Sequence, residues 1–138
     1  MTRTLLFRGQ LVLPEVITPG SVLVRDGRIA EILPAGAAGP TDAVLVDAGE
    51  GYITPGFIDL HVHGGAGGDF MDGTDESFRL ALRAHARHGT TRLAVTTTVA
   101  RHDQILQTLN LTRQYLRQPD AAGSRVLGAH FYGPYFRR

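Results

Sequence analysis

Two histidines, His61 and His63, close a short apolar segment that begins at Phe57. Because alternate residues of a β-strand point to the same side, both imidazoles are expected on one face of a strand. Neutral imidazole is a common ligand of Zn²⁺ and Fe²⁺, and such an ion lowers the pKa of bound water so that a nucleophile forms near neutral pH. The same spacing also suits two half-buried histidines that bond backbone carbonyls, and the pair alone leaves both alternatives open.

The glycine-rich residues 64–68, directly after the pair, favour the metal. Glycine lets a ligand approach the backbone closely, so Gly64 and Gly65 are candidate pocket residues. The run lacks the lysine and the hydroxyl residue of a phosphate-binding P-loop, and it lacks the spacing of a dinucleotide fingerprint. The sequence therefore predicts a flexible loop beside an active site.

Three more residues are candidates for the same pocket. Asp59 lies two residues before His61 on the same face, where it could bind the metal, orient a histidine or pack in a core. His130 and Tyr132 lie near the end of a later apolar segment and share a face with each other. The other histidines stand on or beside predicted helices, where capping or solvation is expected: His85, His88 and His102.

The first part of the chain, residues 1–52, has the pattern of short β-strands. The pair Asp26-Gly27 between two apolar runs predicts a β-hairpin, and the whole segment is expected to form a small antiparallel sheet. The predicted strands are residues 4–8, 10–13, 22–24, 29–33 and 44–47.

From residue 53 to residue 138 strands alternate with helices, which is typical of α/β proteins with parallel strands. The predicted elements are strands 57–63, 91–98 and 125–131, and helices 75–88 and 103–117. Gly89 is expected to end the first helix, and the spacing of Leu106 and Leu116 supports the second. A closed barrel needs about eight parallel strands, so the chain is expected to be a truncated part of one.

Composition narrows the chemistry. The 138 residues are 43% hydrophobic, enough for a packed core, and the formal net charge of +1 gives no electrostatic reason to expect nucleic acid as a partner. No apolar run approaches the roughly 20 residues of a membrane span, so no membrane partner and a cytoplasmic location are expected. The chain has no cysteine, and every basic residue is arginine, so neither thiolate nor carboxylated lysine can bind metal.

Several stretches together resemble the amidohydrolase superfamily and, within it, the N-acetylglucosamine-6-phosphate deacetylases. They are residues 55–64, 64–73, 88–91, 96–98 and 128–136. The resemblance implies the first three strands of a (β/α)₈ TIM-type barrel over residues 53–138, preceded by part of a small β-sandwich domain over residues 1–52. It also implies that His61 and His63 hold a divalent metal ion, Zn or Fe, whose water hydrolyses the N-acetyl group of an amino-sugar phosphate.

The full-length protein is expected to form a homo-oligomer, and its substrate is expected to be a small amino-sugar phosphate. The resemblance places the remaining metal ligands and the catalytic aspartate beyond Arg138, so this chain is expected to be inactive by itself.

One position departs from the family. The third barrel strand of these deacetylases usually ends in His-Leu-Glu-Gly-Pro, whose glutamate binds the metal, and this chain has Tyr132 in that place. A neutral phenol with a pKa of about 10 is a much poorer ligand at pH 7 than a carboxylate. Two alternatives to a deacetylase stay open. Another amidohydrolase, dihydroorotase-like or deaminase-like, is one, because the motif of the first barrel strand is shared across the superfamily. A relative that binds without catalysis is the other, because Tyr132 replaces the glutamate.

Overall fold

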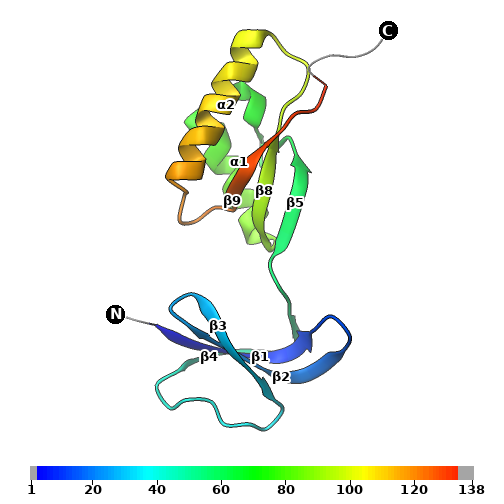
Figure 1. Ribbon diagram of the computed structural model, residues 1–138, viewed down its shortest axis with the longest axis vertical. Helices are drawn as coiled ribbons and strands as arrows, with labels where there is room; N and C mark the ends of the chain where they lie inside the picture. The colour runs from blue at the N-terminus through cyan, green and yellow to red at the C-terminus, as the bar shows by residue number, and fades with distance from the viewer. Residues whose placement is uncertain (1–2, 134–138) are drawn as a thin grey trace. The chain divides into compact units, whose positions relative to one another are not determined.

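The computed structural model describes residues 3–133 of the chain. Residues 134–136 of the family-like stretch 128–136, and with them the end of the second predicted domain, lie outside this part. The chain divides into two compact units, Met1–Pro55 and Gly56–Arg138, whose elements are drawn in Figure 1.

The first unit is a four-stranded sheet of β1 (Thr4–Val12), β2 (Ile17–Arg25), β3 (Arg28–Pro34) and β4 (Val44–Ile53), in the order β3-β2-β1-β4. Strand β1 runs without interruption through the gap left between the predicted strands 4–8 and 10–13, because its pairing with β2 continues across Gly9. The prediction of an antiparallel sheet was wrong for β4. It pairs with β1 in parallel, since the loop of residues 35–43 returns the chain before β4 begins.

The predicted hairpin at Asp26-Gly27 is confirmed. It joins the antiparallel strands β2 and β3, and both residues have positive φ, 52° for Asp26 and 72° for Gly27. Such a pair of left-handed residues matches the right-handed twist of the two strands it connects. Leu11 and Leu23 are the buried hydrophobic residues of this sheet in the described part of the chain.

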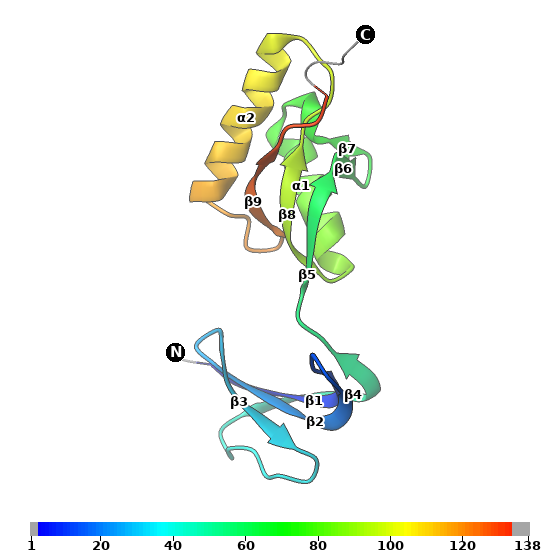
Figure 2. The same ribbon diagram turned by 45° about the vertical axis from the view of Figure 1, so that its right-hand side comes forward.

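The second unit confirms the predicted alternation of strands and helices. Its main elements are β5 (Phe57–Val62), α1 (Asp75–Arg87), β8 (Thr90–Thr96), α2 (His102–Arg117) and β9 (Arg125–His130). The three strands are parallel in the order β5-β8-β9, and Figure 2 shows them side by side and pointing the same way. Their carboxyl ends therefore meet at one edge of the sheet.

Both helices pack on one face of this sheet. Phe78 of α1 contacts Phe70 and stacks on Tyr115 of α2, with ring centroids 4.8 Å and 5.4 Å away, respectively. These rings belong to one buried cluster with residues of all three strands, such as Leu93 and Val126. The helices do not cover the opposite face of the sheet.

The predicted second helix is confirmed as α2, but the leucines whose spacing indicated it are not its most buried residues. Leu106 and Leu116 are 46% and 48% exposed, whereas Thr108 and Thr112 are buried. The buried Thr108 hydroxyl is satisfied, because its Oγ1 lies 3.1 Å from the carbonyl oxygen of Phe70 and can donate to it. Neither helix in residues 3–133 is long and apolar enough to cross a membrane.

The loop predicted at residues 64–68 forms a two-stranded hairpin, β6 (Gly64–Gly65) and β7 (Gly68–Asp69), followed by the short 3-10 helix η1 (Phe70–Asp72). Its glycines permit close packing. A Cβ on Gly64 would lie 2.1 Å from the carbonyl oxygen of Gly68, and one on Gly68 would lie 2.7 Å from that of Ser77. The glycine-rich run therefore allows close contact between backbone segments within the fold.

Candidate metal site

His61 and His63 converge at the carboxyl end of β5. Their Nε2 atoms lie 3.1 Å apart, and their rings meet at 64° with centroids 5.1 Å apart. Val62, between them, is only 4% exposed and packs into the core beneath the helices. Because side chains alternate along a strand, the two imidazoles occupy the face of the sheet that the helices leave free.

The pair fits a metal ion. Zinc binds imidazole nitrogen at about 2.0–2.1 Å, so two Nε2 atoms separated by 3.1 Å could both reach one ion. Within residues 3–133 no group of three or more histidines, cysteines, aspartates and glutamates is arranged to hold a metal. The described residues therefore offer two convergent ligands.

The backbone around the pair is irregular. Asp59 pairs with Leu93 and Val62 pairs with Val95. Between these two pairs β5 contains one residue more than β8, so the register shifts. Asp59 Oδ1 accepts a hydrogen bond from the backbone N–H of His61 over 3.1 Å. Asp59 therefore holds the backbone of the two-histidine segment through a hydrogen bond.

Tyr132 and His130 flank the pair from the end of β9. The Tyr132 ring is 45% exposed, and its centroid lies 4.9 Å from that of His61 and 5.7 Å from that of His63. The His130 ring stands perpendicular to His61, with centroids 4.9 Å apart. Its Nδ1 atom is buried and finds no hydrogen-bond partner among the described residues. The structure thus gathers all four rings at one edge of the sheet.

His85 is a site residue that the sequence reasoning missed. It was expected at a cap or in solvent, but its half-buried Nε2 bonds the carbonyl oxygen of Gly64 over 3.0 Å. Gly65 lies close as well, since a Cβ there would be 3.3 Å from the same nitrogen. The available signal was helical spacing, because His85 shares the apolar side of α1 with Leu82. His88 and His102 are exposed, as predicted.

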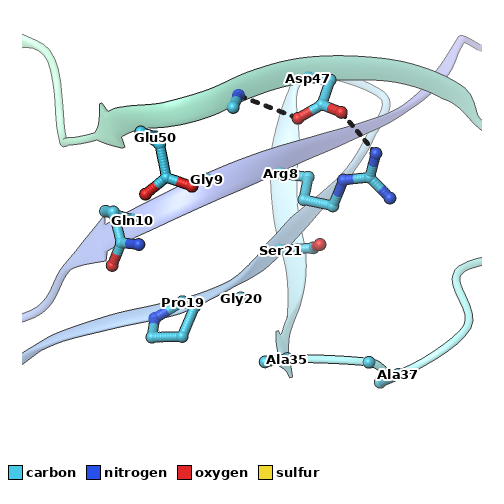
Figure 3. Close-up of a pocket in the computed structure, with 12 residues that line it drawn as sticks. Arg8, Gly9, Gln10, Pro19, Gly20, Ser21, Ala35, Ala37, Asp47 and Glu50 are labelled. Atoms are coloured by element: carbon cyan, nitrogen blue, oxygen red, sulfur yellow. Dashed lines mark hydrogen bonds and ion pairs between the residues drawn. The ribbon is translucent and has the colours of Figure 1, made fainter.

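A separate hollow of about 450 Å³ lies on the first unit, and Figure 3 shows the residues that line it. Arg8 and Asp47 form an ion pair there, and Asp47 also accepts a hydrogen bond from the backbone N–H of Gly49 over 3.0 Å. The guanidinium of Arg8 and the Gly49 amide lower the pKa of the Asp47 carboxyl. The two charges satisfy each other, so we assign no chemistry to this hollow.

Comparison with known proteins agrees with this fold. Residues 52–136 match the model of the amidohydrolase family, and the chain belongs to that family. Proteins of this family generally use a divalent metal ion.

The predicted resemblance to the deacetylases of this family is also confirmed. The chain is 30% identical over 123 residues to N-acetylglucosamine-6-phosphate deacetylase of Bacillus subtilis (strain 168), covering 88% of this chain and 31% of that protein. It is 35% identical over 113 residues to N-acetylgalactosamine-6-phosphate deacetylase of Escherichia coli O157:H7, covering 82% and 28%.

The fold is shared with a solved N-acetyl-D-glucosamine-6-phosphate deacetylase from Mycobacterium smegmatis. The TM-score is 0.80 at 26% identity, and the match covers 98% of this chain and 34% of that one. The chain thus has the fold of the N-terminal part of these TIM-barrel amidohydrolases. It spans about a third of the length of the relatives it matches.

Proposed function

We propose that the protein to which this chain contributes hydrolyses the acetamide C–N bond of an N-acetyl amino-sugar phosphate, such as N-acetylglucosamine-6-phosphate. The observation that carries this proposal is the 3.1 Å separation of the His61 and His63 Nε2 atoms at the carboxyl end of a parallel strand. Barrel enzymes build their active sites at that end. The similarity to sugar-phosphate deacetylases over most of the chain supports the substrate class.

His61 and His63 would hold the metal through Nε2, and imidazole suits Zn²⁺ or Fe²⁺. The bound ion would supply a water of lowered pKa near neutral pH. The chain's own contribution is orientation. Asp59 binds the backbone of His61, and Val62 anchors the segment in the core. The exposed phenol of Tyr132 offers a neutral hydrogen-bonding group beside both rings.

A relative that binds the sugar phosphate without cleaving it is the second candidate. One observation favours it: Tyr132 lies next to His61 at the position where the resemblance implies a metal-binding glutamate. A neutral phenol adds little to the affinity of a site for a divalent ion at pH 7. The two candidates differ in turnover, which can be measured directly.

The test combines metal content with hydrolysis. Protein purified with zinc and iron in the medium is assayed for both metals, and then for turnover of N-acetyl-sugar phosphates, cyclic amides such as dihydroorotate, and aminopurines. The variants His61→Ala and His63→Ala should lose bound metal and at least about 100-fold in activity, since even partners of metal ligands matter by 10–100-fold. The exposed His102 provides the control His102→Ala, which should change neither.

Three outcomes would contradict the proposed deacetylase activity. Absence of metal from the unaltered protein, together with unchanged activity in both histidine variants, would make the pair structural. Hydrolysis confined to a cyclic amide or an aminopurine would assign another amidohydrolase activity. Tight binding of the sugar phosphate without release of acetate would favour the non-catalytic candidate.

A further inference from the structure

We propose that Thr96 is the residue that positions the two-histidine segment of β5, an inference that rests on the metal-binding role proposed above for His61 and His63. Thr96 is the last residue of β8 and is fully buried. Its Oγ1 accepts a hydrogen bond of 2.9 Å from the backbone N–H of Val62, the residue between the two histidines.

A side chain is needed there because the ladder between β5 and β8 is interrupted. In a regular pair of parallel strands, each backbone N–H that points toward the neighbouring strand donates to a carbonyl oxygen of that strand. Here the extra residue in β5, between the pairs Asp59–Leu93 and Val62–Val95, shifts the register. The amide of Val62 then bonds a hydroxyl instead of a carbonyl, and a buried amide without any partner would be costly.

The Thr96 hydroxyl is oriented for this task. Its proton is directed at the carbonyl oxygen of Ala94, 3.3 Å away on the same strand, which leaves its lone pairs for Val62. The neighbouring Thr97 performs the equivalent role toward β9, since its Oγ1 accepts the backbone N–H of Tyr132 over 3.2 Å. Consecutive hydroxyls at the carboxyl end of the central strand thus bind the backbone of Val62 in β5 and that of Tyr132 just beyond β9.

This contact governs the histidines because Val62 is their shared anchor. The Val62 side chain packs into the core and its amide is tied to Thr96, so the strand cannot rotate about its axis at this residue. Metal ligands must be held within about 0.5 Å of their productive positions. Loss of the Thr96 acceptor should therefore loosen the spacing of the two Nε2 atoms.

Three substitutions separate this role from simple packing. Thr96→Val keeps the shape of the side chain and removes the acceptor, whereas Thr96→Ser keeps the acceptor and removes a methyl group. Thr112→Val is the matched control, because Thr112 is also buried but its hydroxyl donates to the carbonyl of Thr108 within α2. If Thr96→Val does not fold, Thr96→Cys, a weak acceptor of similar size, takes its place in the comparison.

The first measurement needs no metal. Hydrogen exchange of the Val62 amide and the ring-proton NMR shifts of His61 and His63 are followed in the full chain. Exchange should quicken at least about tenfold in Thr96→Val, with displaced ring shifts, and both should return toward the unaltered values in Thr96→Ser. The same exchange rate and ring shifts in Thr96→Val and Thr112→Val would overturn the proposal.

The second measurement is the affinity for Zn²⁺, determined by competition with a chromophoric chelator. Thr96→Val should bind zinc about 10–100-fold more weakly, as partners of metal ligands do, and Thr96→Ser should restore most of the affinity. Equal affinity in Thr96→Val and Thr112→Val would overturn the positioning role in a chain that binds zinc. Failure of the unaltered full-length protein to bind zinc would refute the proposed function instead, and the exchange and ring-shift data would then decide the role of Thr96.

Discussion

Tyr132 lies against His61 just beyond the end of β9, with ring centroids 4.9 Å apart and ring planes inclined at 58°. Its backbone is held in place, because the N–H of Tyr132 donates to Thr97 Oγ1 over 3.2 Å. A side chain at this position therefore projects beside the histidine pair whatever its chemistry. Position 132 can therefore supply a ligand beside the histidine pair if its side chain has the right chemistry.

Tyr132→Glu should raise the affinity for a divalent ion. A carboxylate is ionised at neutral pH and binds zinc directly, so we expect affinity to increase about tenfold or more. Zinc titration of the unaltered and substituted chains measures the change. Tyr132→Gln is the control of matched size without charge, and equal affinity of the glutamate and glutamine variants would show that position 132 does not reach the ion.

His85→Ala should loosen the hairpin that follows His63. The substitution removes the only donor that α1 provides to the Gly64 carbonyl in the described part of the chain, and one such hydrogen bond is worth about 1 kcal/mol. The Phe70 amide, which bonds the carbonyl of His63 over 2.8 Å, should exchange faster in the variant. Urea unfolding and amide exchange measure the two effects.

His85→Gln keeps an N–H donor at a similar distance from the backbone and should recover part of both losses. His102→Ala, at an exposed position of α2, should change neither quantity. A hairpin that exchanges equally in all four proteins would mean that its own glycine packing is sufficient to hold it.

The alternation of strands and helices in the second unit was predictable because its signals are local. Phe78, Ala81 and Leu82 repeat at helical spacing and are all buried in α1. Thr90–Thr96 is rich in β-branched residues, which favour strands. The convergence of His61 and His63 also follows from local geometry, since strand alternation alone puts them on one face.

The errors concern contacts between backbone segments, which the local sequence pattern does not specify. The pattern of Val44–Ile53 predicts a strand but cannot identify β1 as its parallel neighbour. Glycines at 64–68 were interpreted as freedom of the chain, whereas the fold uses them to bring backbones together. The hydroxyl of Thr96 and the imidazole of His85 acquire their roles only from residues 34 and 21 positions away.

Ala66→Gly should stabilise the second unit. Ala66 has a φ of 52° and Gly67 a φ of 86° at the tip of the β6–β7 hairpin. A left-handed conformation costs a residue with a Cβ roughly 1 kcal/mol, so removing the methyl group should raise the free energy of unfolding by about 0.5–1 kcal/mol. Urea unfolding measures this change.

The opposite sign is expected for Ala86→Gly, which places glycine inside α1 and should lower the free energy of unfolding by about 1 kcal/mol. Gly67→Ala should also destabilise, because it introduces a Cβ at positive φ. If Ala66→Gly destabilises as much as Ala86→Gly, the backbone at position 66 is not strained.

The ion pair of Arg83 with Asp120 should make the stability of the second unit decrease at acidic pH. Arg83 Nε–H donates to Asp120 Oδ2 over 2.7 Å, and the Asp120 side chain is only 12% exposed. The Arg83 guanidinium, helped by the Ala122 amide, lowers the pKa of the Asp120 carboxyl in the folded state. The stabilisation is therefore complete above the unfolded pKa of about 3.9 and is lost as the pH falls through the lower folded pKa.

Asp120→Asn should consequently lower the free energy of unfolding by about 1 kcal/mol at pH 7, a modest value because the guanidinium is half exposed to solvent. The difference from the unaltered protein should shrink as the pH falls below about 4, because the unfolded carboxyl takes up a proton there before the folded one does, and it should vanish only below the lowered folded pKa. Urea unfolding of both proteins at about every half pH unit between pH 3 and pH 7 measures how their free energies of unfolding converge. In the background of Arg83→Gln the same substitution should have a smaller effect, and an undiminished effect there would assign the stabilisation to the Ala122 amide instead.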